Sequence, residues 1–389
     1  MTQPQQGSGP PSGGLPGRQL EQRRGERGIE WLLTALGRIL VSLIVPGILF
    51  IVLWQGFLFL RAGDAPRMVI ALVAIVWGVG GALGLFFAMN FVVERMPPTW
   101  GRRFTPFVFV GAALAIVAWY LLVPTIRSIY LSFLGPDSEQ FVGFANWIYA
   151  FTSDSMLQSF RNNLLWLVFG TFFSVAFGLL IATLANRTVG AFEVVIKALI
   201  FMPMAISMVG ASIIWRFIYE YRPPGSTQIG LLNAIVQGLG GTPQAWLLLR
   251  PWNNFFLIAV FVWLQTGFAM IVISSALKNV PQELKEAARI DGANEFQLFF
   301  GVTIPYIWGT IVTVSTTIIL NSLRIFDIVR SMTGGNFGTQ VIANEQYTQM
   351  FRAFHYGRGA AIAVVLFVVV VPVMIYNLRS FVGQTEAFR

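Results

Sequence analysis

Long apolar stretches dominate this chain and constrain its fold more than any other feature. A membrane-spanning helix needs about 20 mostly apolar residues, because the hydrocarbon core of a bilayer is about 30 Å thick. By that measure the sequence predicts about eight spanning helices, near residues 37–60, 68–93, 107–130, 163–186, 194–218, 254–277, 305–326 and 359–379. Pro124 and Arg127 interrupt the end of the third, and Pro203 predicts a kink in the fifth. The chain is therefore predicted to be an all-α integral membrane protein.

The composition agrees with a membrane location and excludes several other classes of protein. Hydrophobic residues make up 56% of the chain and charged residues 11%, against roughly 25% charged residues in soluble proteins. We assign the net charge of +9 to cytoplasmic segments and expect no nucleic-acid partner. Cysteine is absent and His355 is the single histidine. The sequence therefore predicts no disulfide, no metal site and no histidine cluster.

The first 106 residues are predicted to form a tail, a basic collar and two spans. Residues 1–30 are a tail rich in Pro, Gly and Gln followed by a basic collar, and the tail is predicted to be disordered because it has little to bury. Residues 31–106 hold the first two spans, which we expect to remain as membrane anchors, because the first apolar stretch is too long for a cleaved signal. Basic residues concentrated in the collar and at 94–104 favour a multi-pass protein with both termini in the cytoplasm.

A second pattern lies between the sixth and seventh spans, at residues 277–305. Asn279 and Pro281 favour the start of a helix, and Gly292 ends it. Apolar residues with i, i+3, i+4 spacing precede and follow the glycine: Leu284, Ala287 and Ala288, then Phe296, Phe299 and Phe300. The pattern predicts two short amphipathic helices joined by a turn. On these residues alone, a loop resting in the lipid interface is an equal alternative.

The sequence of this loop resembles the EAA loop of permease subunits in binding-protein-dependent ABC importers. The resemblance is strongest to the carbohydrate, or maltose-type, permeases. The resemblance is carried by Glu286-Ala287-Ala288, Asp291-Gly292-Ala293, Phe299 and Ile304-Pro305. Val302 and Ile304 stand where the family usually has isoleucine and leucine. The resemblance covers about residues 107–385. It implies a six-helix permease core at 107–389, a coupling loop at 278–305 and two additional helices ahead of the core.

The resemblance also implies partners in a prokaryotic plasma membrane. Two ATP-binding subunits would receive the first helix of the loop, a second permease would complete the pore, and an extracytoplasmic sugar-binding protein would deliver the sugar. The implied ATPase contacts are Glu286, Ala287, Ala288, Asp291 and Gly292. No lysine of the chain stands in a Gly-Lys-Ser/Thr motif, so ATP hydrolysis is expected on a separate subunit. We therefore expect no enzymatic activity, no catalytic residue and no cofactor.

Polar groups inside two of the spans are candidates for substrate contact, because such groups are costly at membrane depth. Asn321 and Arg324 share one face of the seventh span, but Arg324 and Asp327 have the same spacing, and an ion pair between them is an equal alternative. For the two aromatic residues of the sixth span, Trp263 and Phe268, packing or interfacial anchoring is favoured over sugar stacking. By position, the resemblance implies a sugar site at Gln265, Thr266, Phe268, Asn321, Ser322 and Arg324.

The outer connections carry weaker signals. The tract at 333–345 and the later segment at 357–361 resemble permeases for α-glucosides. Trp147, Trp246 and Trp252 are expected to meet the binding protein or to anchor at the membrane interface, and His355 is expected to be exposed or hydrogen-bonded. Two other functions remain open from the residues. An ion-coupled secondary transporter leaves the loop at 277–305 unexplained, and a membrane-embedded glycosyltransferase lacks paired carboxylates for acid-base chemistry.

Overall fold

A computed structural model of the chain describes residues 43–96, 98–188, 190–223 and 225–387. The predicted disordered tail and the first residues of the predicted span at 37–60 lie outside these residues. The described part is helical, and its only β-type pairing is an isolated bridge between Leu134 and Phe141. The chain divides into two units, Met1–Pro124 and Thr125–Arg389, which are described separately.

The first unit contains the two predicted N-terminal spans. They are the helix Leu43–Ala62 and α2, Arg67–Glu94, and both are long and apolar enough to cross a membrane. The indole N–H of Trp77 on α2 donates to the carbonyl of Leu53 at 3.0 Å and ties the two helices together. Gly56 lies beneath this ring, where a Cβ would meet the indole.

Among the described residues, six helices are long and apolar enough to cross a membrane, or seven if one sharply bent pair counts as a span. The predicted third span, 107–130, is not among the six. It lies within an uninterrupted helical run composed of α3 (Pro98–Val117), a π-helical turn (Ala118–Leu122) and α4 (Val123–Leu131).

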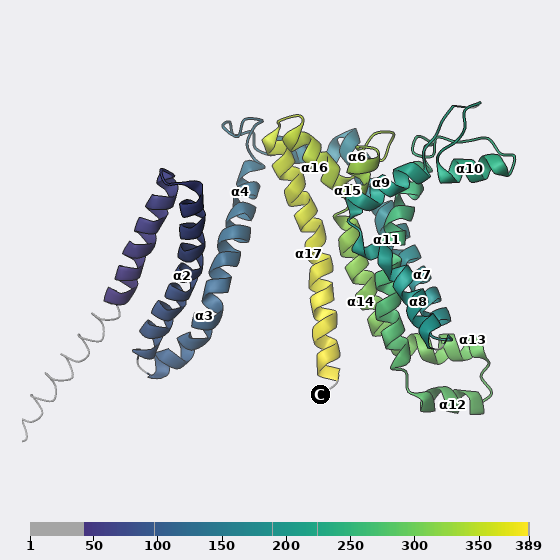
Figure 1. The fold of residues 1–389 in the computed structure, drawn as a ribbon, viewed down its shortest axis with the longest axis horizontal. Helices are drawn as coiled ribbons and strands as arrows, with labels where there is room; N and C mark the ends of the chain where they lie inside the picture. Colours follow the sequence, from purple (N-terminus) through teal and green to yellow (C-terminus); the bar gives the residue numbers. More distant parts are fainter. Residues whose placement is uncertain (1–42, 97, 189, 224, 388–389) are drawn as a thin grey trace, which may run out of the picture. The chain divides into compact units, whose positions relative to one another are not determined.

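The second unit is built around α11, Asn253–Lys278 (Figure 1). In its most apolar stretch 67% of the residues are buried, against 22% to 33% in the other three unbroken spans of this unit. Those three spans consist of α6 (Asp154–Leu165), a π-helical turn (Trp166–Gly170) and α7 (Thr171–Ala185); α13 (Glu295–Leu298), a π-helical turn (Phe299–Thr303) and α14 (Ile304–Leu323); and the first part of α17 (Tyr356–Ala387).

Close helix packing explains why α11 occupies the centre. Gly178 of α7 faces α11 so closely that a Cβ there would lie 2.9 Å from the backbone nitrogen of Met270. Small residues allow such approach in membranes, where packing rather than the hydrophobic effect drives helix association. Trp166 and Phe261 are both fully buried and meet edge to face, with ring centroids 5.8 Å apart. The packed core of this unit therefore runs along α7 and α11.

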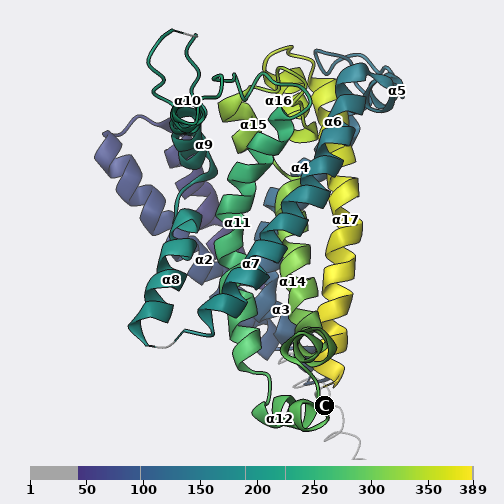
Figure 2. The same ribbon diagram turned by 90° about the vertical axis from the view of Figure 1, so that its right-hand side faces the viewer.

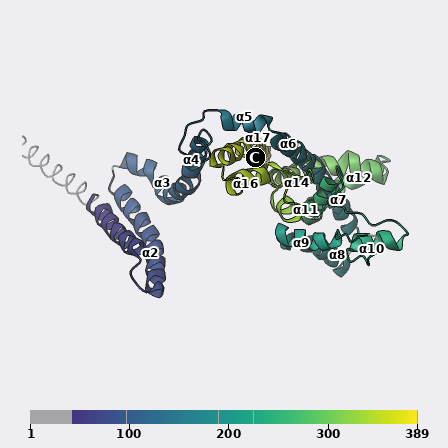
Figure 3. The same ribbon diagram turned by 90° about the horizontal axis from the view of Figure 1, so that it is seen from above.

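The fifth span is broken, and the prediction of a single kinked helix at 194–218 was wrong. The segment consists of α8 (Ala191–Phe201), a 3-10 turn (Met202–Ala205) and α9 (Met208–Ile218), with a bend of 103° between the halves. Pro203 lies in the turn, and the Ser207 side chain accepts from the Gly210 N–H at 3.1 Å and so caps α9 as a new helix. Together with α10 (Leu231–Gly238), α8 and α9 lie on one side of α11, away from α14 and α17 (Figures 2 and 3).

The two ends of the second unit differ in character. At one end, α12 (Gln282–Ile290) lies beside α13, with which the span Glu295–Leu323 begins (Figure 1). The opposite end carries four shorter elements: α5 (Ala145–Thr152), α10, α15 (Asp327–Met332) and α16 (Ile342–Phe351). The candidate coupling residues and the candidate sugar-contacting residues therefore fall in different parts of this unit.

Candidate functional site

The loop at 277–305 forms the two helices that the sequence predicts, α12 and α13, with the turn at Gly292. The Gly292 backbone has φ +85°, a left-handed conformation that glycine adopts without strain. The Ala293 N–H donates to the Ala288 carbonyl at 3.0 Å, and the Gly292 N–H to the Arg289 carbonyl at 3.1 Å. These bonds satisfy carbonyl groups at the end of α12. The turn is therefore a defined helix cap.

Side chains fix the second half of this turn. The Asn294 carboxamide accepts from the Gln297 N–H at 2.8 Å, and the Gln297 side chain accepts from the Asn294 N–H at 2.9 Å. This reciprocal pair is a capping box that starts α13. An ion pair of 3.0 Å between Arg289 and Glu295 then bridges the two helices.

Large apolar side chains are exposed on α12 and α13, among charged residues. Of the five predicted ATPase contacts, Ala288 is half-buried and the others are exposed. Ile290 and Phe296 are 86% and 74% exposed. Exposed apolar side chains beside accessible carboxylates are typical of a protein interaction surface. The sequence pattern did not single out Ile290, although its position directly before Asp291 and Gly292 places it at the turn.

A cluster of charges near this loop was also missed by the sequence analysis. Glu193 at the start of α8 lies 2.6 Å from Lys278 at the end of α11 and also pairs with Lys197. The Lys197 ammonium donates to Asn186 at 2.8 Å and contacts Ser274. The i, i+4 spacing of Glu193 and Lys197 was a readable signal. The cluster ties the ends of α7, α8 and α11 together.

The predicted sugar-contacting residues occupy two levels of the bundle. Gln265 and Thr266 are buried halfway along α11, and Phe268 is half-buried below them. Asn321 and Ser322 lie in the last turn of α14. Gln265 makes no side-chain hydrogen bond within the described residues, whereas Thr266 donates to the Val262 carbonyl at 2.7 Å.

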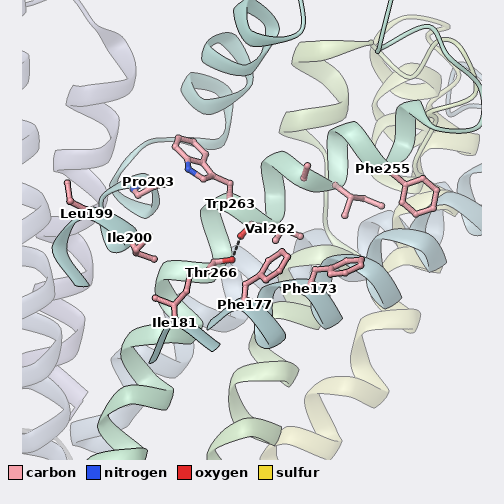
Figure 4. Close-up of a pocket in the computed structure, with 12 residues that line it drawn as sticks. Phe173, Phe177, Ile181, Leu199, Ile200, Pro203, Phe255, Val262, Trp263 and Thr266 are labelled. Carbon is pink, nitrogen blue, oxygen red and sulfur yellow. Dashed lines mark hydrogen bonds between the residues drawn. The ribbon is translucent and has the colours of Figure 1, made fainter. Parts of the chain in front are cut away.

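An apolar cavity of about 530 Å³ lies between α7, α8 and α11 (Figure 4). Of the six predicted residues, Thr266 alone lines it. Figure 4 shows Trp263 and Thr266 on α11 beside the aromatic rings of α7; the labelled wall also includes Phe173, Phe177, Ile181, Leu199, Ile200 and Pro203. Trp263 packs edge to face on Trp215 at 5.7 Å, in keeping with its predicted packing role. The Thr266 hydroxyl in the cavity wall already donates to a carbonyl of α11. The cavity therefore offers few hydrogen-bonding groups to a polar ligand.

The structure does not support one of the two alternatives for Arg324, the ion pair with Asp327. Its guanidinium donates to the Asn321 side chain at 3.4 Å and to the Leu320 carbonyl at 3.2 Å. The alternative ion pair with Asp327 does not form, because α14 ends at Leu323 and Arg324 is already outside the helix. The i, i+3 rule applies only within a continuous helix. Arg324 is exposed and remains accessible to a ligand.

The tract at 333–345 surrounds a buried carboxylate that sequence analysis did not single out. Glu345 is 3% exposed. It accepts four hydrogen bonds, from Tyr149 at 3.0 Å, Ser155 at 2.7 Å, Gln340 at 2.6 Å and Gln349 at 2.8 Å. Burial, and then the Glu345 charge, raise the pKa of the Tyr149 phenol. This arrangement joins α5, α6 and α16 to one another.

The candidate contacts with a binding protein include Trp147 and Trp252, which differ in exposure. Trp252 is 62% exposed, whereas Trp147 is half-buried and donates to Ser132 at 3.1 Å. His355 accepts from the Arg358 N–H at 3.3 Å, which confirms the prediction of a hydrogen-bonded histidine. Burial, together with the nearby Arg358, lowers the pKa of this imidazole.

Known proteins resemble this chain over most of its length. Residues 174–381 match the family described as binding-protein-dependent transport system inner membrane component. The osmoprotective compounds uptake permease protein GgtC of Synechocystis sp. is 52% identical over 279 residues, which are 72% of this chain and 99% of that protein. The alpha-glucoside transport system permease protein AglF of Rhizobium meliloti is 45% identical over 328 residues, 81% of this chain and 97% of that protein.

A solved structure shares the fold. It is the crystal structure of a bacterial ABC transporter involved in the import of the acidic polysaccharide alginate, and it matches with a TM-score of 0.61 and 20% sequence identity. The match covers 72% of this chain and 98% of that chain. This chain therefore shares its helical arrangement with a chain of that transporter.

Proposed function

Because the chain belongs to the family of inner membrane components of binding-protein-dependent transport systems, we propose that it is the permease subunit of an ATP-driven importer for an α-glucoside. The observation that carries the proposal is the 45% identity to an α-glucoside permease, which extends over nearly the whole of that relative. An osmoprotective compound is the second candidate substrate, because the relative named for such compounds is 52% identical. Membership of this family and the shared fold favour the importer over an ion-coupled transporter or a glycosyltransferase.

The chain is proposed to work with separate ATP-binding subunits, in two copies. The absence of a Gly-Lys-Ser/Thr motif supports this division of labour. Glu286, Ala287, Ala288, Asp291 and Gly292 are the proposed contacts, and the exposure of α12 supports that role. Closure of the ATPases on nucleotide would then act on α11 and α14, which flank the loop, and alternate access to the substrate path.

The remaining assembly follows the same proposal. A second permease completes the path, and a sugar-binding protein docks at the end that carries α10 and α16. Both termini lie in the cytoplasm, with the tail and collar at 1–30, the two additional helices at 31–106 and the permease core at 107–389. The sugar contacts are Gln265, Thr266, Phe268, Asn321, Ser322 and Arg324; the unbonded Gln265 amide and the accessible Arg324 support that assignment.

The test is ATPase stimulation and uptake by the complete complex in vesicles with its binding protein. Labelled maltose, trehalose and sucrose represent α-glucosides, and glycine betaine represents osmoprotective compounds. Stimulation and uptake by an α-glucoside are expected. Uptake of glycine betaine alone would transfer the proposal to the second candidate, and uptake that continues without any ATPase subunit would refute the importer.

One variant tests the placement of the sugar contacts. Asn321→Leu removes a side-chain amide at the end of α14 and should weaken sugar binding by about 1 to 3 kcal/mol, the scale of a lost buried hydrogen-bond partner. Thr313→Val on the same helix is the matched control, because the Thr313 hydroxyl already donates to the Gly309 carbonyl at 2.9 Å. Equal half-saturating sugar concentrations in the two variants would remove Asn321 from the site.

A further inference from the structure

A second pocket, of about 260 Å³, lies beyond the end of α9 and is not among the predicted sites. Its walls come from three segments of the second unit: residues 216–221, 245–248 and 332–337. The side chains used in the argument below are Arg216, Tyr219, Glu220, Tyr221, Trp246 and Phe337. Unlike the apolar cavity between α7 and α11, this pocket combines aromatic rings with both signs of charge.

The aromatic wall of the pocket is held rigidly. The Tyr219 hydroxyl donates to the Phe256 carbonyl at 3.0 Å, and Trp246 packs edge to face on the Phe256 ring at 5.1 Å. Tyr221 and Phe337 complete the wall and are 36% and 44% exposed. Accessible rings beside anchored ones provide flat apolar surfaces at low entropic cost.

The polar groups of the pocket have unused bonding capacity. Arg216 and Glu220 have i, i+4 spacing, yet they form no ion pair with each other in the described structure. Arg216 makes one long contact, to the Ser331 carbonyl at 3.5 Å, and the Glu220 carboxylate makes no hydrogen bond within the described residues. The Trp246 indole N–H is buried without a partner. A ligand with several hydroxyl groups could bond Arg216 and Glu220, because it offers donors and acceptors together.

The backbone around the pocket is fixed in advance. Asn233 is fully buried, and its side chain donates to the carbonyls of Glu220 at 2.9 Å and Gln244 at 3.0 Å. It thereby joins the two segments that carry Glu220 and Trp246. Phe337 adopts φ +57°, which is unusual for a residue with a side chain, and its carbonyl accepts from Asn253 at 2.8 Å. Strained residues held in this way are often found at binding sites.

We propose that this pocket binds one pyranose unit of the transported sugar before the sugar enters the membrane-spanning path. The proposal rests on the proposed function and adds an outer subsite to it. Apolar pockets with a few placed polar groups are the usual form of small-ligand sites. Here the rings accept the CH faces of the sugar, and Arg216 and Glu220 bind its hydroxyls. The opposite charges of Arg216 and Glu220 favour a neutral ligand over an anion.

The experiment locates sugar on the complete complex in nanodiscs, without the binding protein. The probe is maltose carrying a diazirine, and the photolabelled peptides are identified by mass spectrometry with and without excess maltose. Maltose-sensitive labelling is expected in peptides that contain Tyr221 or Trp246. Arg216→Gln should reduce it about five- to tenfold, as expected for the loss of one hydrogen bond. Trp246→Phe should also reduce it, because the smaller ring offers less apolar surface to the sugar.

Two matched controls separate sugar binding from general damage. Arg222→Gln removes the same charge from an exposed residue outside the pocket, and Trp308→Phe makes the same change at a 58% exposed position on α14. Neither should change the labelling. Equal amounts of assembled complex and equal basal ATPase activity show that each variant folds.

Three results would overturn the proposal. The first is maltose-sensitive labelling found only in peptides that contain residues 265–268 or 321–324, which would contradict the outer subsite but not the proposed importer function. Unchanged pocket labelling in both Arg216→Gln and Trp246→Phe would do so as well. The third concerns the binding protein. If Arg216→Gln and Trp246→Phe abolish ATPase stimulation by the sugar-free binding protein but leave the labelling unchanged, the pocket contacts that protein and not the sugar. Failure of the importer itself is recognised separately, as absent uptake of every α-glucoside by the unmodified complex.

Discussion

Replacement of Gly292 tests the proposed coupling between this chain and its ATPases. A Cβ at this position would meet nothing within 4 Å, so a substitution causes no collision. Its cost comes from the backbone, because φ +85° lies in the left-handed region that residues with a side chain rarely adopt. For alanine that cost is about 1 to 2 kcal/mol, enough to lower the population of the native turn about five- to thirtyfold relative to its opened form.

Gly292→Asn is the informative partner of Gly292→Ala. Asparagine tolerates the left-handed region better than alanine, although its side chain is larger. Strain therefore predicts that alanine harms coupling more than asparagine, whereas a steric contact with an ATPase predicts the reverse. Gly301→Ala on the same loop is the control, because Gly301 has open space and no positive φ.

The assay has two readouts on complexes purified from membranes. Copurification of the ATPase subunits reports attachment, and the ratio of uptake to ATP hydrolysis reports coupling. Gly292→Ala should lower at least one of them, with normal membrane insertion and a normal Gly301→Ala control. Wild-type values of both in Gly292→Ala would refute the reasoning, because the turn would then tolerate strain without affecting its partner.

Two further changes test the architecture of the second unit. Gly178→Ala should destabilise the chain by about 1 to 3 kcal/mol, the usual cost of overpacking, because α7 and α11 would have to separate; the apparent melting temperature should fall below that of Gly301→Ala, and an unchanged value would contradict the packing. Glu345→Gln removes the charge that four donors share and should cost about 2 kcal/mol. Its thermal unfolding is compared with that of Glu139→Gln, an exposed carboxyl in the connection before α5, and equal melting temperatures would show that the carboxylate charge is dispensable.

The sequence predicted the structure of the loop at 277–305 well because that structure is determined locally. Gly292 ends α12 with a positive φ, and short-range capping bonds start α13. Both features depend on residue types that can be read from the sequence. The N-terminal spans at 43–94 were also predictable from length and hydropathy alone.

The broken fifth span shows where local reasoning ends. Pro203 identified the position of the break, but the bend of 103° depends on packing against another helix. Gly267 of α11 approaches so closely that a Cβ there would lie 2.6 Å from the Ile200 carbonyl. Ser207 was a readable helix start that would have divided the span in two.

Long-range polar contacts were beyond the sequence for a different reason. Two partners of Glu345, Tyr149 and Ser155, precede it by 196 and 190 residues, and no periodic pattern connects them with it. The same limit applied to Arg324, whose spacing fitted two partners until the end of α14 at Leu323 excluded Asp327.

The Glu345 network has a consequence for the order in which the chain can assemble as it is synthesised. Tyr149 and Ser155 leave the ribosome 196 and 190 residues before the carboxylate that they bond. The side chains of Asn162 and Asn163 likewise bond to backbone groups that are synthesised much later, the Gln340 carbonyl and the Ile342 N–H. Most buried polar groups are paired in a finished structure. The hydrogen bonds of α5 and α6 with α16 therefore form only after the last part of the chain has been synthesised.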